Sequence, residues 1–182
     1  MGMAATIPYY TVEDLAHFPN DGNRYELLDG VLLVTPAPGF SHELVVSRIS
    51  QFLTPAVQVP GYAFVLTHGA VALLPKTQLE PDLLVVPASV SPNSKWHEIT
   101  GHWLAVEVIS RSSRIYDRDF KRDAYLTLGV REVWLVDRDD RSVDVTRARG
   151  EIETVRDTIV WRPPTLDLEV RVDLREIFAG IE

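Results

Sequence analysis

One acidic residue stands inside an otherwise apolar run near the middle of the chain. Glu107 lies within HWLAVEVIS (102–110), whose apolar side chains predict a buried strand. A carboxylate among apolar neighbours is costly to hold ionised unless a cation, a hydrogen-bond donor or a metal ion meets it. Glu107 is therefore a candidate functional residue. The alternative is that this strand lies at a sheet edge and that Glu107 faces water.

A second acid and a lysine extend the pattern. Asp82 follows Pro81 and opens the apolar run LLVV, and Lys121 lies on the helical segment after Glu107. If the two apolar runs pair as neighbouring strands, the two carboxylates come close together. At ~4 Å they would repel by about 4 kcal/mol at an effective dielectric near 20, so a proton or a divalent cation must offset the repulsion. Hard carboxylate oxygens suit Mg²⁺ or Mn²⁺ better than Zn²⁺.

The combination predicts metal-dependent phosphodiester hydrolysis. Asp82 and Glu107 are the expected metal ligands, and the bound ion would lower the pKa of its water. The ammonium group of Lys121 would orient the attacking water or stabilise charge on the phosphate. Asp117, four residues earlier, could hold that lysine as an i,i+4 pair. Taken singly, Asp82 also fits a turn residue and Lys121 a surface lysine.

Length and composition indicate an ordinary globular protein. The chain has 182 residues, of which 46% are hydrophobic and 24% charged, so we expect a single domain over residues 1–182. It contains no cysteine, which excludes disulfides and thiolate metal sites. No apolar run approaches the roughly 20 residues that span a bilayer, and no signal peptide is evident. We therefore expect a cytoplasmic protein with no membrane partner.

The charge distribution points in two directions. A formal net charge of −8 counts against a general nucleic-acid binder, because phosphate neutralisation needs Lys and Arg. Basic residues nevertheless crowd the segment after Glu107, namely Arg111, Arg114, Arg118, Lys121, Arg122 and Arg131. This segment is either a local basic rim or the solvated face of a helix.

Hydrophobic periodicity and turn residues predict the secondary structure. Residues 24–34 form a hairpin about Asp29-Gly30. Amphipathic helices are expected from Ser41 and over Tyr116–Leu128, with Gly129 ending the second. A short helix from Thr11 closes at Pro19, and residues 87–101 form a loop in which Trp96 could stack on a base. Further strands are predicted at 62–67, 70–75, 82–86, 102–109 and 132–137, and in the segments SVDVTR, ETVRDTIVW and DLEVRVDL.

This order of elements predicts an α/β (α+β) fold. A helix between 102–109 and 132–137 permits a parallel crossover between those two strands. The expected architecture is a mixed central sheet flanked by helices, with an N-terminal hairpin and a β-rich C-terminal tail.

The chain resembles a known nuclease family. PDLLVV (81–86) followed by AVEVISRSSRIYDRDFKRDAYLTLGVREVWLVD (105–137) is similar to the Uma-type restriction endonuclease family, a branch of the PD-(D/E)XK superfamily. The resemblance extends upstream through YELLDGVLLV and His42. It implies a restriction-endonuclease-like αβββαβ core in which Asp82 and Glu107 bind the metal.

The resemblance also locates the lysine. The superfamily pattern has a lysine two residues after the second acid, where this chain has Ile109, and the family resemblance places it at Lys121 instead. Glu26 and His42 occupy positions that the family favours, where they either complete the metal shell or touch substrate. Glu26 equally fits an exposed hairpin acid, and His42 a helix-start residue packed on the sheet.

Three functions of different kinds follow, the third being a structural oligomer whose sheet edge pairs with itself. The first is a Mg²⁺- or Mn²⁺-dependent endodeoxyribonuclease that acts on nucleic acid, expected to be DNA, as a homodimer with the 142–172 tail as candidate interface. The second is a catalytically inactive nuclease-fold module that binds or regulates. The acidic net charge and the absence of lysine at position 109 favour the second.

Overall fold

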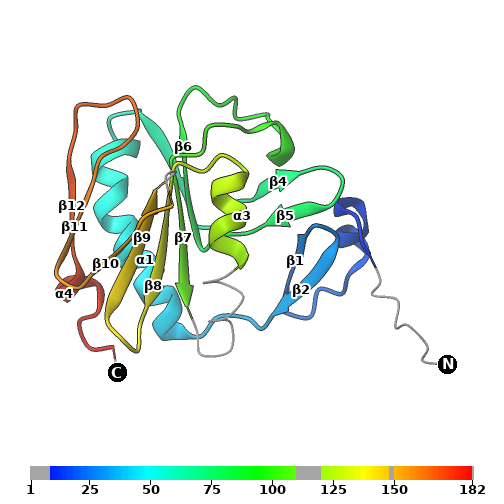
Figure 1. The fold of residues 1–182 in the computed structure, drawn as a ribbon, viewed down its shortest axis with the longest axis horizontal. Helices are drawn as coiled ribbons and strands as arrows, with labels where there is room; N and C mark the ends of the chain where they lie inside the picture. The colour runs from blue at the N-terminus through cyan, green and yellow to red at the C-terminus, as the bar shows by residue number, and fades with distance from the viewer. Residues whose placement is uncertain (1–8, 110–119, 148–149, 182) are drawn as a thin grey trace.

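Three β-sheets build the part of the chain described by the computed structural model, residues 9–109, 120–147 and 150–181 (Figure 1). The central sheet has the strand order β10-β9-β8-β7-β6-β3. Its strands are β3 (Ala63–Leu66), β6 (Leu83–Pro87), β7 (Leu104–Ile109), β8 (Glu132–Asp137), β9 (Ser142–Arg147) and β10 (Ile152–Val155). A smaller sheet, in the order β2-β1-β5-β4, contains β1 (Arg24–Leu28), β2 (Val31–Thr35), β4 (Val71–Leu73) and β5 (Thr77–Leu79). The third is a ribbon of β11 (Thr158–Trp161) and β12 (Val170–Asp173).

Helices are short in the described residues, apart from one. They are η1 (Val12–His17), α1 (Phe40–Leu53), η2 (Thr54–Gln58), η3 (Trp96–Glu98), α3 (Arg122–Thr127) and α4 (Leu174–Ile177). The predicted Thr11 cap is confirmed, since its backbone N–H and hydroxyl both donate to Asp14 Oδ2, at 2.7 and 2.9 Å. The helix that follows is a 3₁₀ turn.

The central sheet is mixed, as predicted. β6 and β7 run antiparallel, with Leu83 opposite Val106, whereas β7 and β8 run parallel, with Leu104 opposite Glu132. The other neighbours in this sheet pair antiparallel. The parallel pair confirms the predicted crossover between 102–109 and 132–137, and the α/β (α+β) class is confirmed with it.

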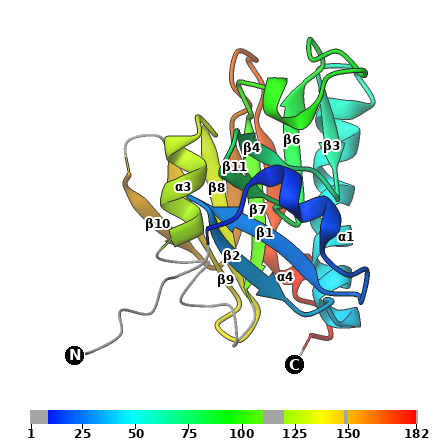
Figure 2. The same cartoon turned by 90° about the vertical axis from the view of Figure 1, so that its right-hand side faces the viewer.

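Both faces of the central sheet are covered, which explains the nearly continuous apolar runs of its middle strands. α1, the β11–β12 ribbon and α4 pack on one face, over residues such as Val106 and Trp134. α3 and the small sheet pack on the other face, over residues such as Ala105 and Leu135 (Figures 1 and 2). β6, β7 and β8 therefore present alternate residues to two separate cores.

Several predicted boundaries were wrong. The predicted 70–75 strand is the short β4, and β5 was missed because Pro75 separates two runs of only three residues. The segment ETVRDTIVW divides into β10 and β11, which belong to different sheets. Asp82 lies one residue before β6 rather than in it. The predicted start of the 116–128 helix lies outside the described residues, while its end near Gly129 is confirmed.

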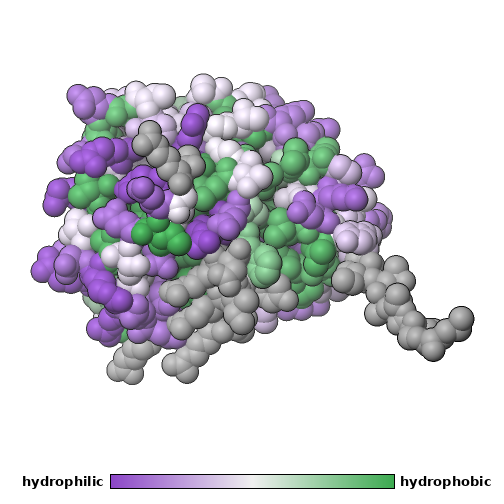
Figure 3. Space-filling model, viewed as in Figure 1, coloured by the Kyte–Doolittle hydropathy of each residue, from purple (hydrophilic) through white to green (hydrophobic). Residues whose placement is uncertain are grey.

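The surface separates by polarity on the face that Figure 3 shows. Apolar surface is most continuous over the side of the molecule that holds the small sheet. Val34 on β2 is 50% exposed and Leu73 on β4 is 60% exposed. Within the described residues, none of the helices is long and apolar enough to cross a membrane. A single domain over residues 1–182 and a cytoplasmic location stay predictions.

Candidate active site

Asp82 and Glu107 lie side by side on one face of the central sheet. The β6–β7 register pairs Leu83 with Val106, and extending it by one residue places Asp82 opposite Glu107. By strand alternation, Glu107 shares its face with Ala105, on the side that packs against α3. Both carboxyls are buried, with 4% of Asp82 and 3% of Glu107 exposed. β7 is internal to the sheet, so the interpretation of Glu107 as an edge residue facing water was wrong.

Three donors hold the Asp82 carboxylate. Arg24 Nη1, from β1, donates to Oδ1 at 2.9 Å. His42 Nε2, from the first turn of α1, lies 3.0 Å from Oδ2, and the backbone N–H of Val108 donates to the same oxygen at 2.8 Å. Asp82 therefore links the small sheet, α1 and β7 at one point.

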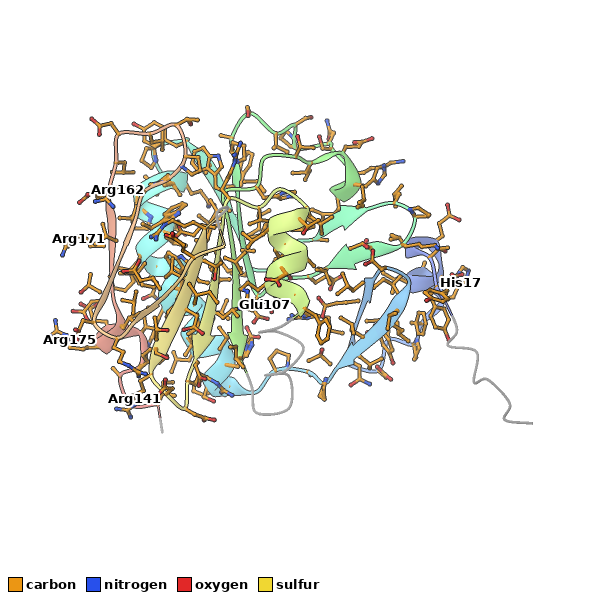
Figure 4. All side chains as sticks on the ribbon, in the orientation of Figure 1. His17, Glu107, Arg141, Arg162, Arg171 and Arg175 are labelled. Atoms are coloured by element: carbon orange, nitrogen blue, oxygen red, sulfur yellow. The ribbon has the colours of Figure 1, made fainter. Side chains whose placement is uncertain are left out.

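A lysine joins two further buried carboxylates. Lys121, at the N-cap of α3, donates from Nζ to Glu26 Oε2 at 2.6 Å, and the same nitrogen lies 3.5 Å from Glu107 Oε1. The hydroxyl of Tyr125, one helical turn later, donates to Glu107 Oε1 at 2.6 Å. Glu26 also accepts the backbone N–H of Glu80 at 2.7 Å. Figure 4 shows Glu107 near the carboxyl end of β7, beside the beginning of α3.

These side chains form one group, called here the buried charge cluster: Arg24, Glu26, His42, Asp82, Glu107, Lys121 and Tyr125. Burial raises the pKa of Asp82, but the hydrogen bond from His42 and the charges of His42 and Arg24 outweigh it and hold the pKa below its ordinary value. Burial, followed by the charges of Glu107 and Glu26, raises the pKa of Tyr125 well above its ordinary value. Tyr125 is thus a neutral hydrogen-bond donor at neutral pH.

The donor chemistry of the cluster fits a hard divalent cation. Mg²⁺ is usually bound by one or two carboxylates, with water and phosphate oxygens as the other ligands. A carboxylate has about four acceptor positions, and Asp82 uses three of them on Arg24, His42 and Val108. The described residues contain no group of three or more His, Asp or Glu side chains arranged to hold a metal ion. Asp82 and Glu107 remain the predicted metal ligands.

Sequence reasoning found part of this cluster. Asp82, Glu107 and Lys121 were singled out and lie together, and Glu26 and His42 join them. The interpretation of Glu26 as an exposed hairpin acid was wrong, because Glu26 is 0% exposed.

Two members of the cluster were missed. Tyr125 could have been found from its i,i+4 spacing after Lys121. Nothing in the sequence marks Arg24 as a functional residue, because a charged residue at the start of a strand is commonplace. Asp117 and the basic residues Arg111, Arg114 and Arg118 lie outside the described residues.

A second group of charges lies far from this cluster. Figure 4 shows Arg141, Arg162, Arg171 and Arg175 along the side of the molecule that holds the β11–β12 ribbon, across from Glu107. Arg162 pairs with Glu169, and Arg175 Nη2 lies 2.6 Å from Asp173 Oδ2. Arg141 donates to the carbonyl of Ile181 at 2.7 Å. Most of this row is paired within the chain, so it is a poor candidate for binding phosphate.

Comparison with known proteins gives the same class of fold. The model of the Uma2 family, described as "Putative restriction endonuclease", matches residues 12–179, and the chain belongs to this family. A solved structure from Anabaena variabilis, described as a "putative nuclease belonging to DUF820", is similar with a TM-score of 0.75 and 18% sequence identity. The similarity covers 95% of this chain and 99% of that one. No curated protein matches the sequence.

The lowered pKa of Asp82 makes a prediction about stability and pH. A carboxyl group whose pKa falls on folding stabilises the protein above its unfolded pKa, ordinarily 3.8, and loses this contribution as the pH falls through the folded value. We expect Asp82→Asn to lower the free energy of unfolding at pH 7 and the difference from wild type to shrink below pH 3.8. Urea unfolding of both proteins at pH 7 and pH 3 measures this. A difference that grows in acid would contradict the prediction.

Proposed function

We propose that the protein is a Mg²⁺- or Mn²⁺-dependent endodeoxyribonuclease that hydrolyses phosphodiester bonds. Asp82 and Glu107 are the proposed metal ligands, and Lys121 the proposed transition-state cation. The observation that carries the proposal is the approach of Lys121 Nζ to within 3.5 Å of Glu107 Oε1. An ammonium group from α3 thus reaches the carboxylate that the superfamily pattern pairs with a lysine two residues later on the same strand.

The residues of the cluster have separable roles in this proposal. When bound, the divalent ion supplies a water of lowered pKa and neutralises charge on the phosphate. Glu26 fixes Lys121 through the 2.6 Å contact, so that its ammonium group can donate to a phosphate oxygen without reorganising. Tyr125 holds Glu107 by one oxygen, and Arg24 and His42 orient Asp82. The cluster is preorganised by contacts from four separate elements.

Plasmid nicking tests the proposed activity. We expect purified protein to convert supercoiled plasmid to the open-circle form with Mg²⁺ or Mn²⁺, and to lose this activity in excess chelator and regain it when the metal is restored. Conversion that continues in chelator would exclude the metal-dependent route. Absence of conversion with every divalent ion, together with retained oligonucleotide binding, would support the alternative.

That alternative is a nuclease-fold module that binds without cutting. It is favoured by the net charge of −8 and by Ile109, which stands where the superfamily pattern has lysine. The Asp82 carboxylate already accepts hydrogen bonds from Arg24, His42 and Val108, which leaves fewer of its lone pairs for a metal ion. This also favours the module that does not cut.

We further propose a homodimer, because cutting both strands of a duplex takes one site per strand. β10 supports this proposal, since it is an outer strand of the central sheet and its first three residues are exposed. Light scattering coupled to size-exclusion chromatography measures the mass directly, and a 20.5 kDa particle at all concentrations would contradict the dimer.

A further inference from the structure

A small cavity opens beside the buried charge cluster. It has a volume of about 180 Å³ and its lining includes Arg24, Glu80 and Pro81, the last two being the residues directly before Asp82. Arg24 Nη1 donates both to the carbonyl of Glu80 at 3.0 Å and to Asp82 Oδ1 at 2.9 Å. Arg24 and Pro81 therefore place the cavity next to the proposed catalytic acid.

An exposed indole forms another part of the lining. All four tryptophans lie within the described residues, and Trp96 is 37% exposed, whereas Trp103 is 6% exposed and Trp134 and Trp161 are fully buried. Trp96 lines the cavity with part of its ring exposed, and indole stacks well on flat aromatic groups. Trp96 is therefore accessible to a ligand in the cavity, unlike the three tryptophans of the core.

The backbone around Trp96 holds the ring in place. Trp96 opens the 3₁₀ turn η3, in which the backbone N–H of Lys95 donates to Glu98 Oε2 at 2.8 Å. Gly69 lies next to the ring, and a Cβ added there would meet Trp96 Cη2 at 3.5 Å and Leu84 Cδ2 at 3.0 Å. A side chain at position 69 would therefore crowd this wall of the cavity.

Lysine and histidine side chains lie near the aromatic ring, and the lining also contains the acid Glu80. Lys95 and His97 flank Trp96 in sequence, and both are exposed, as is His68 in the lining. Basic groups that follow a phosphate backbone, combined with an aromatic ring on which a base stacks, are the usual means of binding single strands. The volume is below the roughly 300–1,000 Å³ of pockets that enclose a drug-sized ligand, so it admits one flat group.

We propose that this cavity receives one nucleobase of the DNA substrate, stacked on Trp96, from a nucleotide next to the phosphate held at Asp82 and Glu107. This inference rests on the proposed nuclease function and specifies its substrate. A base inside a duplex is stacked and paired and cannot enter such a cavity without being turned out of the helix. The preferred substrate is therefore DNA with an unpaired base at this position, in a single strand, a flap or a mismatch.

A larger cavity of about 540 Å³ carries no comparable argument. It is lined in part by Trp103, Arg147 and Trp161, and it lies at the other end of β7, which Trp103 precedes. Arg147 already pairs with Glu132 and Glu153. The base site is therefore assigned to the cavity that adjoins Asp82.

Binding without cleavage tests the proposal. Anisotropy of a labelled duplex carrying one unpaired base, in buffer without divalent ions, is compared with that of the fully paired duplex. We expect wild type to favour the unpaired base, and Trp96→Ala to weaken that binding by about fivefold to 150-fold, the range that loss of one base stack gives. Trp96→Phe keeps a ring and should retain most of the affinity. Tyr62→Ala removes a 48% exposed ring outside the cavity lining. This variant should bind both the duplex with an unpaired base and the fully paired duplex as tightly as wild type does.

The fluorescence of wild type provides an independent signal, because Trp96 is the exposed tryptophan. DNA with an unpaired base should quench emission and protect it from acrylamide.

Equal binding of the two DNAs, or unchanged binding by Trp96→Ala with a native melting curve, overturns the base site while leaving cleavage by wild type intact. Trp96-dependent binding without cleavage keeps the base site and overturns the nuclease activity. A wild type that neither binds nor cuts DNA overturns both.

Discussion

Asp82→Asn should lower metal-dependent DNA cleavage by about 10²–10³-fold, the loss typical of removing one preorganised electrostatic contact from an active site. The substitution removes one of the two carboxylate charges that suit a hard divalent ion. The amide oxygen of asparagine can still accept the Val108 N–H, which donates to Asp82 Oδ2 at 2.8 Å in wild type. Plasmid nicking rates at saturating Mg²⁺ measure the loss, and thermal melting confirms that the variant is folded.

Calorimetric titration with Mn²⁺ separates the metal site from the chemistry. Wild type should bind the ion and Asp82→Asn should bind it much more weakly, as should Glu107→Gln. Asp167→Asn is the matched control, because it removes the same charge from an exposed position. Equal Mn²⁺ binding by wild type and Asp82→Asn would remove Asp82 from the metal site, whatever the nicking assay shows.

The second large effect concerns stability. Lys121→Met should lower the free energy of unfolding by about 3–5 kcal/mol, the usual result of removing one partner of a buried ion pair. The reason is local: Lys121 is 4% exposed, and its Nζ lies 2.6 Å from Glu26 Oε2, on a side chain that is fully buried. Removing the ammonium group leaves the buried Glu26 carboxylate without its closest cation, so the cost of taking this charge out of water is no longer offset by the ion pair. Equilibrium urea unfolding at pH 7 measures the change.

A double-mutant cycle assigns this loss to the pair. Adding Glu26→Gln to Lys121→Met should recover part of the stability, because the neutral amide no longer needs a cation. Lys95→Met, at an exposed lysine, should stay within about 0.5 kcal/mol of wild type. If the two single changes prove additive, Glu26 and Lys121 do not interact as the contact distance indicates.

The candidate site could be predicted in part because its acids break a local pattern. Glu107 lies in the run LAVEVI, where each neighbour is apolar, so six consecutive residues indicate that it needs a partner if the strand is internal. The sheet topology then showed that the strand is internal. Asp82 was found in the same way, at the boundary between Pro81 and an apolar run. The strand assignments for 102–109 and 132–137 were confirmed for the same reason, since hydrophobic runs of this length are local features.

The particular contacts within the cluster could not be predicted from the residues alone, because most of the partners are distant in sequence. Lys121 meets Glu26 across 95 positions, and Arg24 meets Asp82 across 58. The i,i+4 pairing expected between Asp117 and Lys121 is the kind of contact that a sequence shows, and Asp117 lies outside the described residues. Arg24 was missed because nothing near it in the chain distinguishes it from a solvated strand residue.

The amino-acid order alone determined that this chain has an α/β (α+β) architecture, with one acid in a strand, a second acid beside an apolar run and a lysine on the next helix. Polarity and periodicity determine these features because they act over a few residues. Packing in three dimensions decided which charges meet. The β6–β7 register sets Asp82 opposite Glu107, and the small sheet brings Arg24 and Glu26 to them. The physical reason is that a buried charge needs a partner, while its neighbours in sequence do not say which distant residue will provide it.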